Sequence, residues 1–306
     1  MAARAPGFED PWPNAFILKA LRATMADVET TLYFVGTAGA GKSSMVAAYD
    51  RWAKQHAITT VLVNLDPGAE KLPYEPDVDI RDWVKISEIM EENGLGPNGA
   101  QVAAADMIAL NLEEVMAEIS GFRADQILVD TPGQLELFVF RQSGKHIVST
   151  LNPSRSVIAY LLDPFLARTP VGFASQLMLG ATTHFRFQEP MLFVLSKADR
   201  IDPDSVETIK AWAADPDSLE SDVLGEAPGM ATEFAASVSR LLAGMAVEST
   251  LTAVSSVDGT GLDDLYRLFQ GAVGESEDAT PEYDTFLTGD REEGKDESDE
   301  LPDELN

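Results

Sequence analysis

The sequence predicts a three-layer α/β fold, in which helices cover both faces of a mainly parallel sheet. Apolar, strand-like runs recur along the chain, at residues 31–36, 59–66, 126–131, 155–163, 190–196 and 250–255. Helix-like patterns fall between them, at residues 43–56, 100–118, 135–149, 173–187, 232–246 and 262–271. Near-continuous apolar strands that alternate with amphipathic helices are typical of a parallel sheet buried on both sides. Because this region has no internal repeat and no Pro/Gly-rich hinge, we expect one domain.

Each element has its own local signal. The first strand, "TLYFVG", is rich in β-branched and aromatic residues and runs directly into a glycine-rich turn and a helix. The second and third strands, "TTVLVNLD" and "QILVDT", both place an aspartate at or near their ends. The runs "RSVIAYLLD", "PMLFVLS" and "TLTAVS" complete the sheet. Residues 201–231 are acidic and interrupted by prolines, so we interpret them as a surface insertion.

The two ends differ from the middle of the chain. We expect residues 1–27 to be an extension without a motif, and Met25 leaves open whether translation starts there. Residues 274–306 are acidic and nearly free of large aliphatic side chains, so burial cannot offset the entropy of ordering them. We therefore expect a domain over residues 28–273 and a disordered acidic C-terminal tail.

Composition restricts the classes of function. The 51 acidic and 22 basic residues give a formal net charge of −29, which disfavours direct binding to a nucleic acid backbone. Acidic residues recur throughout the chain, which favours adaptation to a salty cytosol over a single basic partner, and a halophilic archaeon as the source. No apolar run approaches the roughly 18 residues of a membrane span, so we expect a cytoplasmic protein. With no cysteine and three histidines, any metal ion should be bound by oxygen.

The strongest motif is "GTAGAGKS", which follows the first strand and opens a helix. It matches the phosphate-binding loop pattern G-x-x-x-x-G-K-[ST] in the required structural context. Backbone N–H groups of such a loop surround the β-phosphate, Lys42 spans the β- and γ-phosphates, and the Ser43 hydroxyl binds Mg²⁺. The residues predicted to bind nucleotide here are Gly36, Gly39, Ala40, Gly41, Lys42, Ser43 and Ser44.

Two aspartates mark the ends of neighbouring strands. In "ILVDTPGQ", Asp130 can hold Mg²⁺ through water, the Gly133 N–H can contact the γ-phosphate, and Gln134 can orient the attacking water. In "VNLDPGAE", Asp66 reaches the same edge of the sheet and can share the metal ion and water. The alternatives are a helix N-cap after the strand at Asp130 and a simple Asp-Pro-Gly turn at Asp66.

The segment "SKAD" after the fifth strand is the predicted base-reading site. The Asp199 carboxylate can accept both the N1 and N2 hydrogens of guanine, and the Lys197 stem can cover the ring, which points to GTP. In "AVSSVDGTG", the backbone N–H groups of Ser255 and Ser256 are weaker candidates for contact with the base oxygen.

Taken together, these motifs resemble those of the GPN-loop GTPases, a family within the P-loop NTPases. The resemblance rests on "GTAGAGKSS", "NLDPGAEKLPYEPDVDIRD", "GLGPNGA", "DTPGQLELF" and "SKAD", which occur in this order between residues 36 and 199. By local rules alone, Gly96-Pro97-Asn98 would be a turn. The family instead implies a P-loop NTPase fold with helical insertions, and an inserted Gly-Pro-Asn loop whose Asn98 reaches across a tight homodimer toward the partner's γ-phosphate. Ser196 departs from the family's usual asparagine, which leaves the strictness of GTP over ATP in question.

The function predicted from the sequence is Mg²⁺-dependent hydrolysis of GTP by a homodimeric switch. Asp66, Asn98, Asp130 and Gln134 are the predicted catalytic residues, and Ser43, Asp66 and Asp130 the predicted metal-binding residues. The family resemblance also implies a role in assembling complexes such as RNA polymerase. Two alternatives stay open: a phosphotransferase, and a nucleotide-locked scaffold with negligible turnover. The acidic "PDVDIRD" segment either shapes the switch or its dimer contact, or is a solvated helix start.

Overall fold

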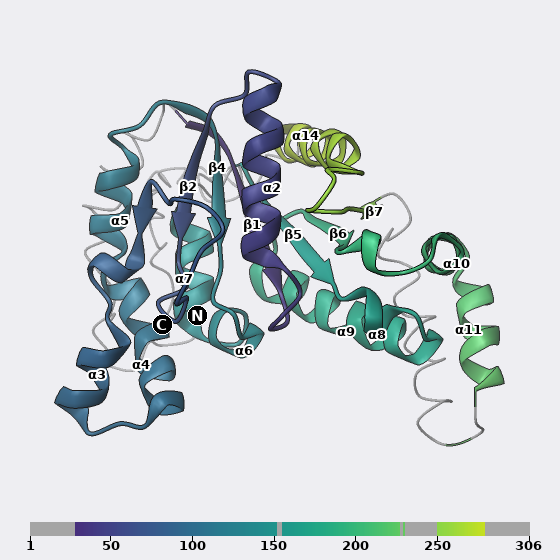
Figure 1. Ribbon diagram of the computed structural model, residues 1–306, viewed down its shortest axis with the longest axis horizontal. Helices are drawn as coiled ribbons and strands as arrows, with labels where there is room; N and C mark the ends of the chain where they lie inside the picture. The colour runs from purple at the N-terminus through teal and green to yellow at the C-terminus, as the bar shows by residue number, and fades with distance from the viewer. Residues whose placement is uncertain (1–27, 152–154, 227–228, 230–249, 279–306) are drawn as a thin grey trace, which may run out of the picture.

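The described part of the chain folds around a parallel sheet of seven strands. A computed structural model describes residues 28–151, 155–226, 229 and 250–278 (Figure 1). The strands are β1 (Val28–Gly36), β2 (Thr60–Asn64), β3 (Val78–Asp79), β4 (Ala124–Asp130), β5 (Ser156–Leu162), β6 (Met191–Leu195) and β7 (Leu251–Ala253). Their spatial order is β3-β2-β4-β1-β5-β6-β7, and every pairing is parallel. The predicted α/β architecture is confirmed.

Helices connect the strands. They are α2 (Lys42–Gln55), α3 (Ile86–Asn93), α4 (Pro97–Leu110), α5 (Leu112–Ile119), α6 (Leu135–Phe138), α7 (Gln142–Thr150), α8 (Pro164–Ala167), α9 (Pro170–Phe187), α10 (Pro203–Ala214), α11 (Pro216–Gly225) and α14 (Leu262–Asp278). Short 3₁₀ turns occur at Ile80–Asp82 and Ala198–Arg200. Within the described residues, none of these helices is long and apolar enough to cross a lipid bilayer.

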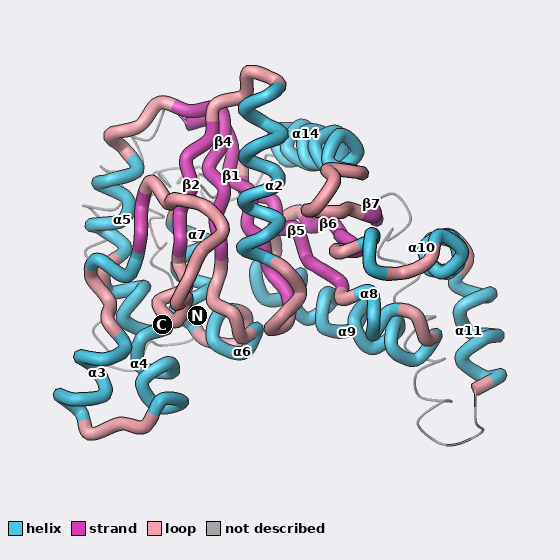
Figure 2. Tube along the Cα trace, viewed as in Figure 1, coloured by secondary structure: helices cyan, strands magenta, loops and turns pink. Residues whose placement is uncertain are grey.

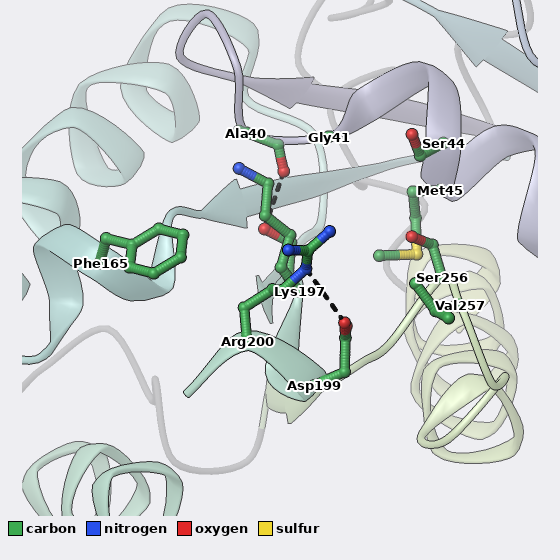
Figure 3. Close-up of a pocket in the computed structure, with 11 residues that line it drawn as sticks. Ala40, Gly41, Ser44, Met45, Phe165, Lys197, Asp199, Arg200, Ser256 and Val257 are labelled. Carbon is green, nitrogen blue, oxygen red and sulfur yellow. Dashed lines mark hydrogen bonds and ion pairs between the residues drawn. The ribbon is translucent and has the colours of Figure 1, made fainter. Parts of the chain in front are cut away.

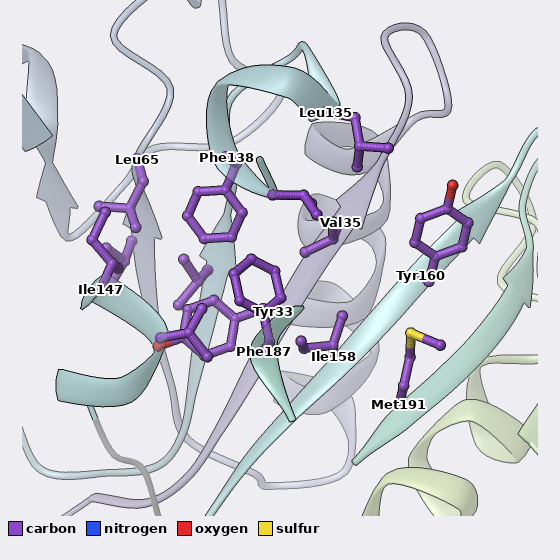
Figure 4. Close-up of a cluster of buried hydrophobic side chains, with 14 of the residues drawn as sticks. Tyr33, Val35, Leu65, Leu135, Phe138, Ile147, Ile158, Tyr160, Phe187 and Met191 are labelled. Atoms are coloured by element: carbon purple, nitrogen blue, oxygen red, sulfur yellow. The ribbon is translucent and has the colours of Figure 1, made fainter. Parts of the chain in front are cut away.

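Two hydrophobic cores lie on opposite faces of the sheet. The sheet separates them. Successive side chains of β1 alternate between the two cores: Leu32 and Phe34 point to one face, whereas Tyr33 and Val35 point to the other. Helices α2 and α14 cover the first face, and α4, α5, α7 and α9 cover the second (Figure 2). On the second face, Tyr33 and Val35 pack among Phe138, Phe187 and other buried side chains (Figure 4). The three layers thus follow from the period-two pattern of the strands.

Several helix boundaries differ from the sequence prediction. The helix expected over residues 100–118 begins earlier, at Pro97, and is divided at Asn111 into α4 and α5. The helix expected over 135–149 is likewise divided into α6 and α7. In each case a periodic apolar pattern continues across a bend, so periodicity alone does not locate the break. The short edge strand β3 was not predicted at all.

The described part of the predicted insertion, residues 201–226, forms two helices. Pro203 and Pro216 are the first residues of α10 and α11, and the side chains of Asp202 and Asp215 accept hydrogen bonds from backbone amides of the first turn. An Asp-Pro pair therefore starts each helix here, because proline at the first position gives up no helical hydrogen bond. The interpretation of these prolines as breaks was wrong.

The C-terminal end of the described chain differs from the predicted domain boundary. Helix α14 continues to Asp278, past the expected domain end at residue 273. The predicted helix at 232–246, the N-terminal extension and the tail from residue 279 lie outside the described residues. The carboxyl ends of the central strands β1, β2, β4, β5 and β6 meet at one edge of the sheet, and the predicted motifs follow these ends.

Candidate active site

The phosphate-binding loop links β1 to α2 and needs glycine at defined places. A Cβ atom at Gly36 would lie 2.9 Å from the carbonyl oxygen of Leu161 in the neighbouring strand. Gly41 has a φ of +96°, a left-handed conformation that other residues rarely adopt. These two constraints explain why the turn between strand and helix is glycine-rich.

Lys42 is buried beneath this loop. Its Nζ donates to the carbonyl oxygens of Gly36 at 3.0 Å, Thr37 at 3.2 Å and Gly133 at 2.9 Å. Burial lowers the pKa of Lys42, and the nearby carboxylates of Asp130 and Asp66 oppose this effect. The side chain thus joins the phosphate loop to the loop that follows β4.

Asp66 is held in place by a network of hydrogen bonds. Its backbone amide donates to the side chain of buried Asn64 at 3.0 Å. Its carboxylate accepts from the amide of Gly68 through Oδ1 and from the amide of Gly133 through Oδ2, both at 2.9 Å. Burial raises the pKa of Asp66, whereas these amides and the Lys42 charge lower it. The carboxylate therefore faces the phosphate loop in a defined orientation.

Asp130, at the end of β4, is fully buried. The hydroxyl of Tyr74 donates to its Oδ2 at 2.9 Å, and the other carboxylate oxygen, Oδ1, has no hydrogen-bond partner among the described residues. Burial raises the pKa of Asp130 to about 6, against the opposing effects of the Ser43 hydroxyl, Tyr74 and Lys42. A buried carboxylate oxygen with no partner is costly to leave unbound, so it marks a position prepared for a ligand.

The donors at this point fit a hard cation. The described residues contain no group of three or more His, Cys, Asp or Glu side chains that could enclose a metal ion. Ser43, Asp66 and Asp130 instead supply oxygen donors next to a phosphate loop. Mg²⁺ is usually bound by one or two carboxylates together with water and substrate phosphates, so these residues suit that ion.

A cavity of about 210 Å³ lies beside Asp66. It is lined by Gly133 and Gln134 from the loop after β4 and, from the α3–α4 region, by Ile86 and Gln101. Gln134 is exposed at the N-terminus of α6. The cavity has room for a water molecule beside the candidate catalytic side chains.

A second cavity, of about 320 Å³, lies on the other side of the phosphate loop (Figure 3). Lys197 and Asp199 line it, together with Phe165 from α8 and Ser256 and Val257 from the loop after β7. Lys197 Nζ forms an ion pair with Asp163 Oδ2 at 3.1 Å and also donates to the carbonyl oxygen of Gly39. A cavity of this size can admit the planar base of a nucleotide.

Ser196 lines this cavity, whereas Ser255 does not. The single Ser196 hydroxyl hydrogen is shared between the carbonyl oxygens of Ala40 at 2.8 Å and Leu162 at 2.9 Å. Ser196 thus still supports the phosphate loop. Ser255 is buried, and its backbone amide donates to the carbonyl oxygen of Thr260. The predicted contact of the Ser255 amide with a base is therefore not available, whereas Ser256 lines the cavity.

Comparison with known proteins agrees with this geometry. A protein-family profile described as "Conserved hypothetical ATP binding protein" matches residues 34–275. The chain is 32% identical over 188 residues to a GPN-loop GTPase of Pyrococcus abyssi. The aligned region covers 61% of this chain and 74% of the relative. The chain belongs to the GPN-loop GTPase family.

Two other GPN-loop GTPase comparisons cover a larger share of this chain. The crystal structure of a Pyrococcus abyssi GTPase in its apo form superposes with a TM-score of 0.70 and 28% identity, covering 79% of this chain and 97% of that one. GPN-loop GTPase 1 of Dictyostelium discoideum is 30% identical over 236 residues, 76% of this chain. The chain spans 59% of the length of that relative.

Within the GPN-loop GTPase fold, the acidic "PDVDIRD" segment proves to be an internal scaffold. Arg81 forms a bidentate ion pair with Asp79 and also donates to the carbonyl oxygen of Ala69 at 2.8 Å. Asp79 in turn accepts from Asn64 at 2.9 Å. These contacts hold the loop that carries Asp66. Asp79 is also the N-cap of the 3₁₀ turn Ile80–Asp82, and Asp82 in that turn is exposed, so part of the segment is the predicted solvated helix start.

The Gly-Pro-Asn segment stands apart from these residues. Gly96 is the N-cap of α4, and Pro97 and Asn98 form its first turn, so the loop is the start of a helix rather than an isolated turn. Asn98 is exposed and lines neither cavity. Helices α3 and α4 project beyond the sheet at the lower left of Figure 1. Gln101, one turn further along α4, does reach the cavity beside Asp66.

Sequence reasoning did not identify Tyr74, Gln101 or Phe165. A tyrosine in an acidic loop, a glutamine in an Ala-rich helix and an exposed phenylalanine carry no motif of their own. For Tyr74, the position inside the family stretch "LPYEPDVDIRD" was the one available signal. The carboxylates Asp66 and Asp130 were both predicted, and the structure brings them together around Lys42.

Proposed function

We propose that this chain hydrolyses GTP to GDP and phosphate in a reaction that depends on Mg²⁺. The observation that supports this most strongly is the convergence of Lys42, Asp66 and Asp130 at one edge of the sheet, next to a cavity lined by Asp199. The relatives are named GTPases, whereas the matching family profile is described as ATP binding. We favour GTP, because a carboxylate at Asp199 accepts hydrogens that guanine has and adenine lacks.

In this proposal the residues of the phosphate loop hold the substrate. The amides of Gly39, Ala40, Gly41 and Ser44 surround the phosphates, and Lys42 exchanges its carbonyl partners for phosphate oxygens. Asp199 selects the base and Lys197 covers it. The loss of one amide at Ser196 weakens this selection without removing it, because Asp199 stays in the cavity wall.

Ser43 and Asp130 would hold the metal ion, with Asp66 beside it. Bound Mg²⁺ would neutralise charge that develops on the phosphate oxygens. Asp66 and Gln134 line one cavity, from which they can orient a water molecule toward the γ-phosphate. The Gly133 amide donates to Asp66 here, and it would exchange this partner for a phosphate oxygen when nucleotide binds.

A phosphate-release assay with purified protein, GTP and Mg²⁺ tests the proposal. Phosphate released without any added acceptor supports hydrolysis and argues against a phosphotransferase. A comparison of GTP and GDP before and after long incubation tests the scaffold alternative, since a scaffold would leave GTP intact. Parallel assays with ATP measure base preference directly.

We further propose that Asn98 acts in trans within a homodimer. In the described chain, exposed Asn98 lines neither cavity, so a role near a γ-phosphate requires a second copy. An asparagine behind a proline is well suited to this, because a stiff segment loses little entropy on docking. Light scattering in buffers of high salt measures the oligomeric state.

A complementation experiment separates the trans role from a cis role. Lys42→Ala removes nucleotide binding from one protomer, and Asn98→Ala removes the asparagine from the other. If Asn98 acts in trans, a mixture of the two inactive variants regains activity, because the intact site meets the intact Asn98 across the dimer. If the mixture stays inactive while each variant still dimerises, the trans role is wrong.

The cellular setting is also a proposal. The net charge of −29 suits a cytoplasm of high salt, such as that of a halophilic archaeon, where screening reduces self-repulsion. Hydrolysis would change the grip of the dimer on client proteins during the assembly of complexes, with RNA polymerase as the first client to test. Capture from a lysate with the GTP-bound and the GDP-bound protein tests whether any client distinguishes the two states.

A further inference from the structure

Tyr74 is not among the predicted site residues, yet it bonds directly to Asp130. It lies in the loop between β2 and β3, and its hydroxyl donates to Asp130 Oδ2 at 2.9 Å across 56 positions of sequence. Its ring packs against the hydrophobic core on the α2 side of the sheet. Packing of the ring therefore holds the hydroxyl beside Asp130, at the carboxyl end of β4.

The hydrogen bond distinguishes the two oxygens of a fully buried carboxylate. Oδ2 is occupied by Tyr74, while Oδ1 has no hydrogen-bond partner among the described residues. The Ser43 hydroxyl, next to the phosphate loop, lowers the pKa of the same carboxylate. Fixing Oδ2 therefore fixes the direction in which Oδ1 is presented, because the two oxygens share one planar group.

A phenol is chemically suited to this task. A lysine or arginine in the same place would neutralise Asp130 and compete with a cation. The tyrosine hydroxyl is a neutral donor, so it orients the carboxylate and leaves the negative charge for the metal ion. Ligands of metal ions are commonly oriented in this way by a second hydrogen-bonding group.

We propose that Tyr74 is a positioning residue, which orients Asp130 so that Oδ1 faces the Mg²⁺ that accompanies GTP. This inference rests on the proposed Mg²⁺-dependent function. The loop that carries Tyr74 is anchored on both sides of it: Asp66 bonds to Gly68 and Gly133, and the Asp77 carboxylate accepts from the Leu62 amide at 2.8 Å. Tyr74 thereby connects this loop to the metal site.

Tyr74→Phe tests the proposal, with Tyr266→Phe as the matched control. Both tyrosines are partly buried against the same hydrophobic core, and Tyr266 lies on α14 next to Trp52. The measurement is binding of a fluorescent, non-hydrolysable GTP analogue, as a function of Mg²⁺ and in EDTA. We expect Tyr74→Phe to raise the half-saturating Mg²⁺ concentration about tenfold, as for a lost hydrogen bond to a charged group, with affinity in EDTA unchanged.

Other outcomes overturn the proposal. If Tyr74→Phe and Tyr266→Phe have the same Mg²⁺ dependence, Tyr74 does not position the ligand. If Tyr74→Phe weakens binding equally with Mg²⁺ and in EDTA, its role is general stability. A wild-type protein whose GTP binding ignores Mg²⁺ would contradict the proposed function itself, and the inference with it.

A double-mutant cycle adds a test that does not depend on a single variant. In an Asp130→Asn background the carboxylate is absent, so Tyr74→Phe should cause no further change in Mg²⁺ dependence. Additive effects of the two substitutions would show that Tyr74 acts independently of Asp130 and would overturn the proposal.

Discussion

The backbone amide of Gly133 donates a hydrogen bond to Asp66 Oδ2 at 2.9 Å. This contact joins the loop after β2 to the loop after β4. The same glycine accepts from Lys42 Nζ through its carbonyl oxygen, also at 2.9 Å. The amide expected from the sequence to contact a γ-phosphate is thus already used by a candidate catalytic carboxylate. A phosphate that enters here must exchange with Asp66 for this donor.

Asp66→Asn should impair hydrolysis far more than binding. The amide side chain keeps the volume of Asp66 but cannot accept a proton from water. We expect the rate of a single turnover to fall on the order of 100-fold, a typical loss for a general base. The affinity for GTP, measured by fluorescence titration, should change little. Asp82→Asn is the control, because Asp82 is exposed in the 3₁₀ turn Ile80–Asp82, and it should leave both the single-turnover rate and the GTP affinity unchanged.

Asp130 should make the stability of the nucleotide-free protein depend on pH. Its pKa of about 6 in the folded state exceeds its usual value of 3.8, so the folded state retains a proton that the unfolded chain has released. The contribution to stability is therefore fully present below about pH 4 and is lost as pH rises through about 6.

Asp130→Asn removes this titration and provides the measurement. Relative to the wild type, the variant should gain unfolding free energy on the order of 3 kcal/mol between pH 4 and pH 8. Urea denaturation without nucleotide measures the difference at each pH. Glu189, whose pKa burial raises to about 7, titrates in both proteins and cancels. A difference that stays constant with pH, or falls, would contradict the burial of an ionised Asp130.

Asp199→Asn should change base preference from GTP to XTP. Xanthine has a carbonyl oxygen where guanine has its 2-amino group, so an amide donor at residue 199 pairs with xanthine and leaves guanine unsatisfied. We expect affinity for GTP to fall about 100-fold and affinity for XTP to rise. Competition between the two nucleotides measures this. Asp204→Asn, at an exposed position on α10, should keep the original preference.

Gln101→Ala tests the contribution of α4 to the site of its own chain. Gln101 lines the cavity that also contains Asp66 and Gln134. Loss of one hydrogen bond to water in this cavity should lower kcat about tenfold, with little effect on GTP affinity. Gln142→Ala, exposed at the first position of α7, is the control. Equal losses in the two variants would show that Gln101 has no special role.

Much of the site could be predicted because its signals are local. A strand, a glycine-rich turn and a helix start lie within one short segment at "GTAGAGKS", so the phosphate loop is recognisable without long-range information. Asp66 and Asp130 were found for a similar reason, since each lies at the end of an apolar strand and parallel strands end at one edge. The positions of Asp-Pro helix starts at 202 and 215 were equally local, yet proline was misread there as a break.

The sequence by itself determined the order of six of the seven described strands and the nature of the phosphate-binding chemistry, because both depend on neighbours along the chain. Only the tertiary structure decided which further side chains join the site. Tyr74 meets Asp130 across 56 positions, and the Ser255 amide is consumed by Thr260 while Ser256 lines the cavity. Such contacts depend on how distant segments pack and on which polar groups form hydrogen bonds with each other in the folded chain. A local sequence pattern specifies neither.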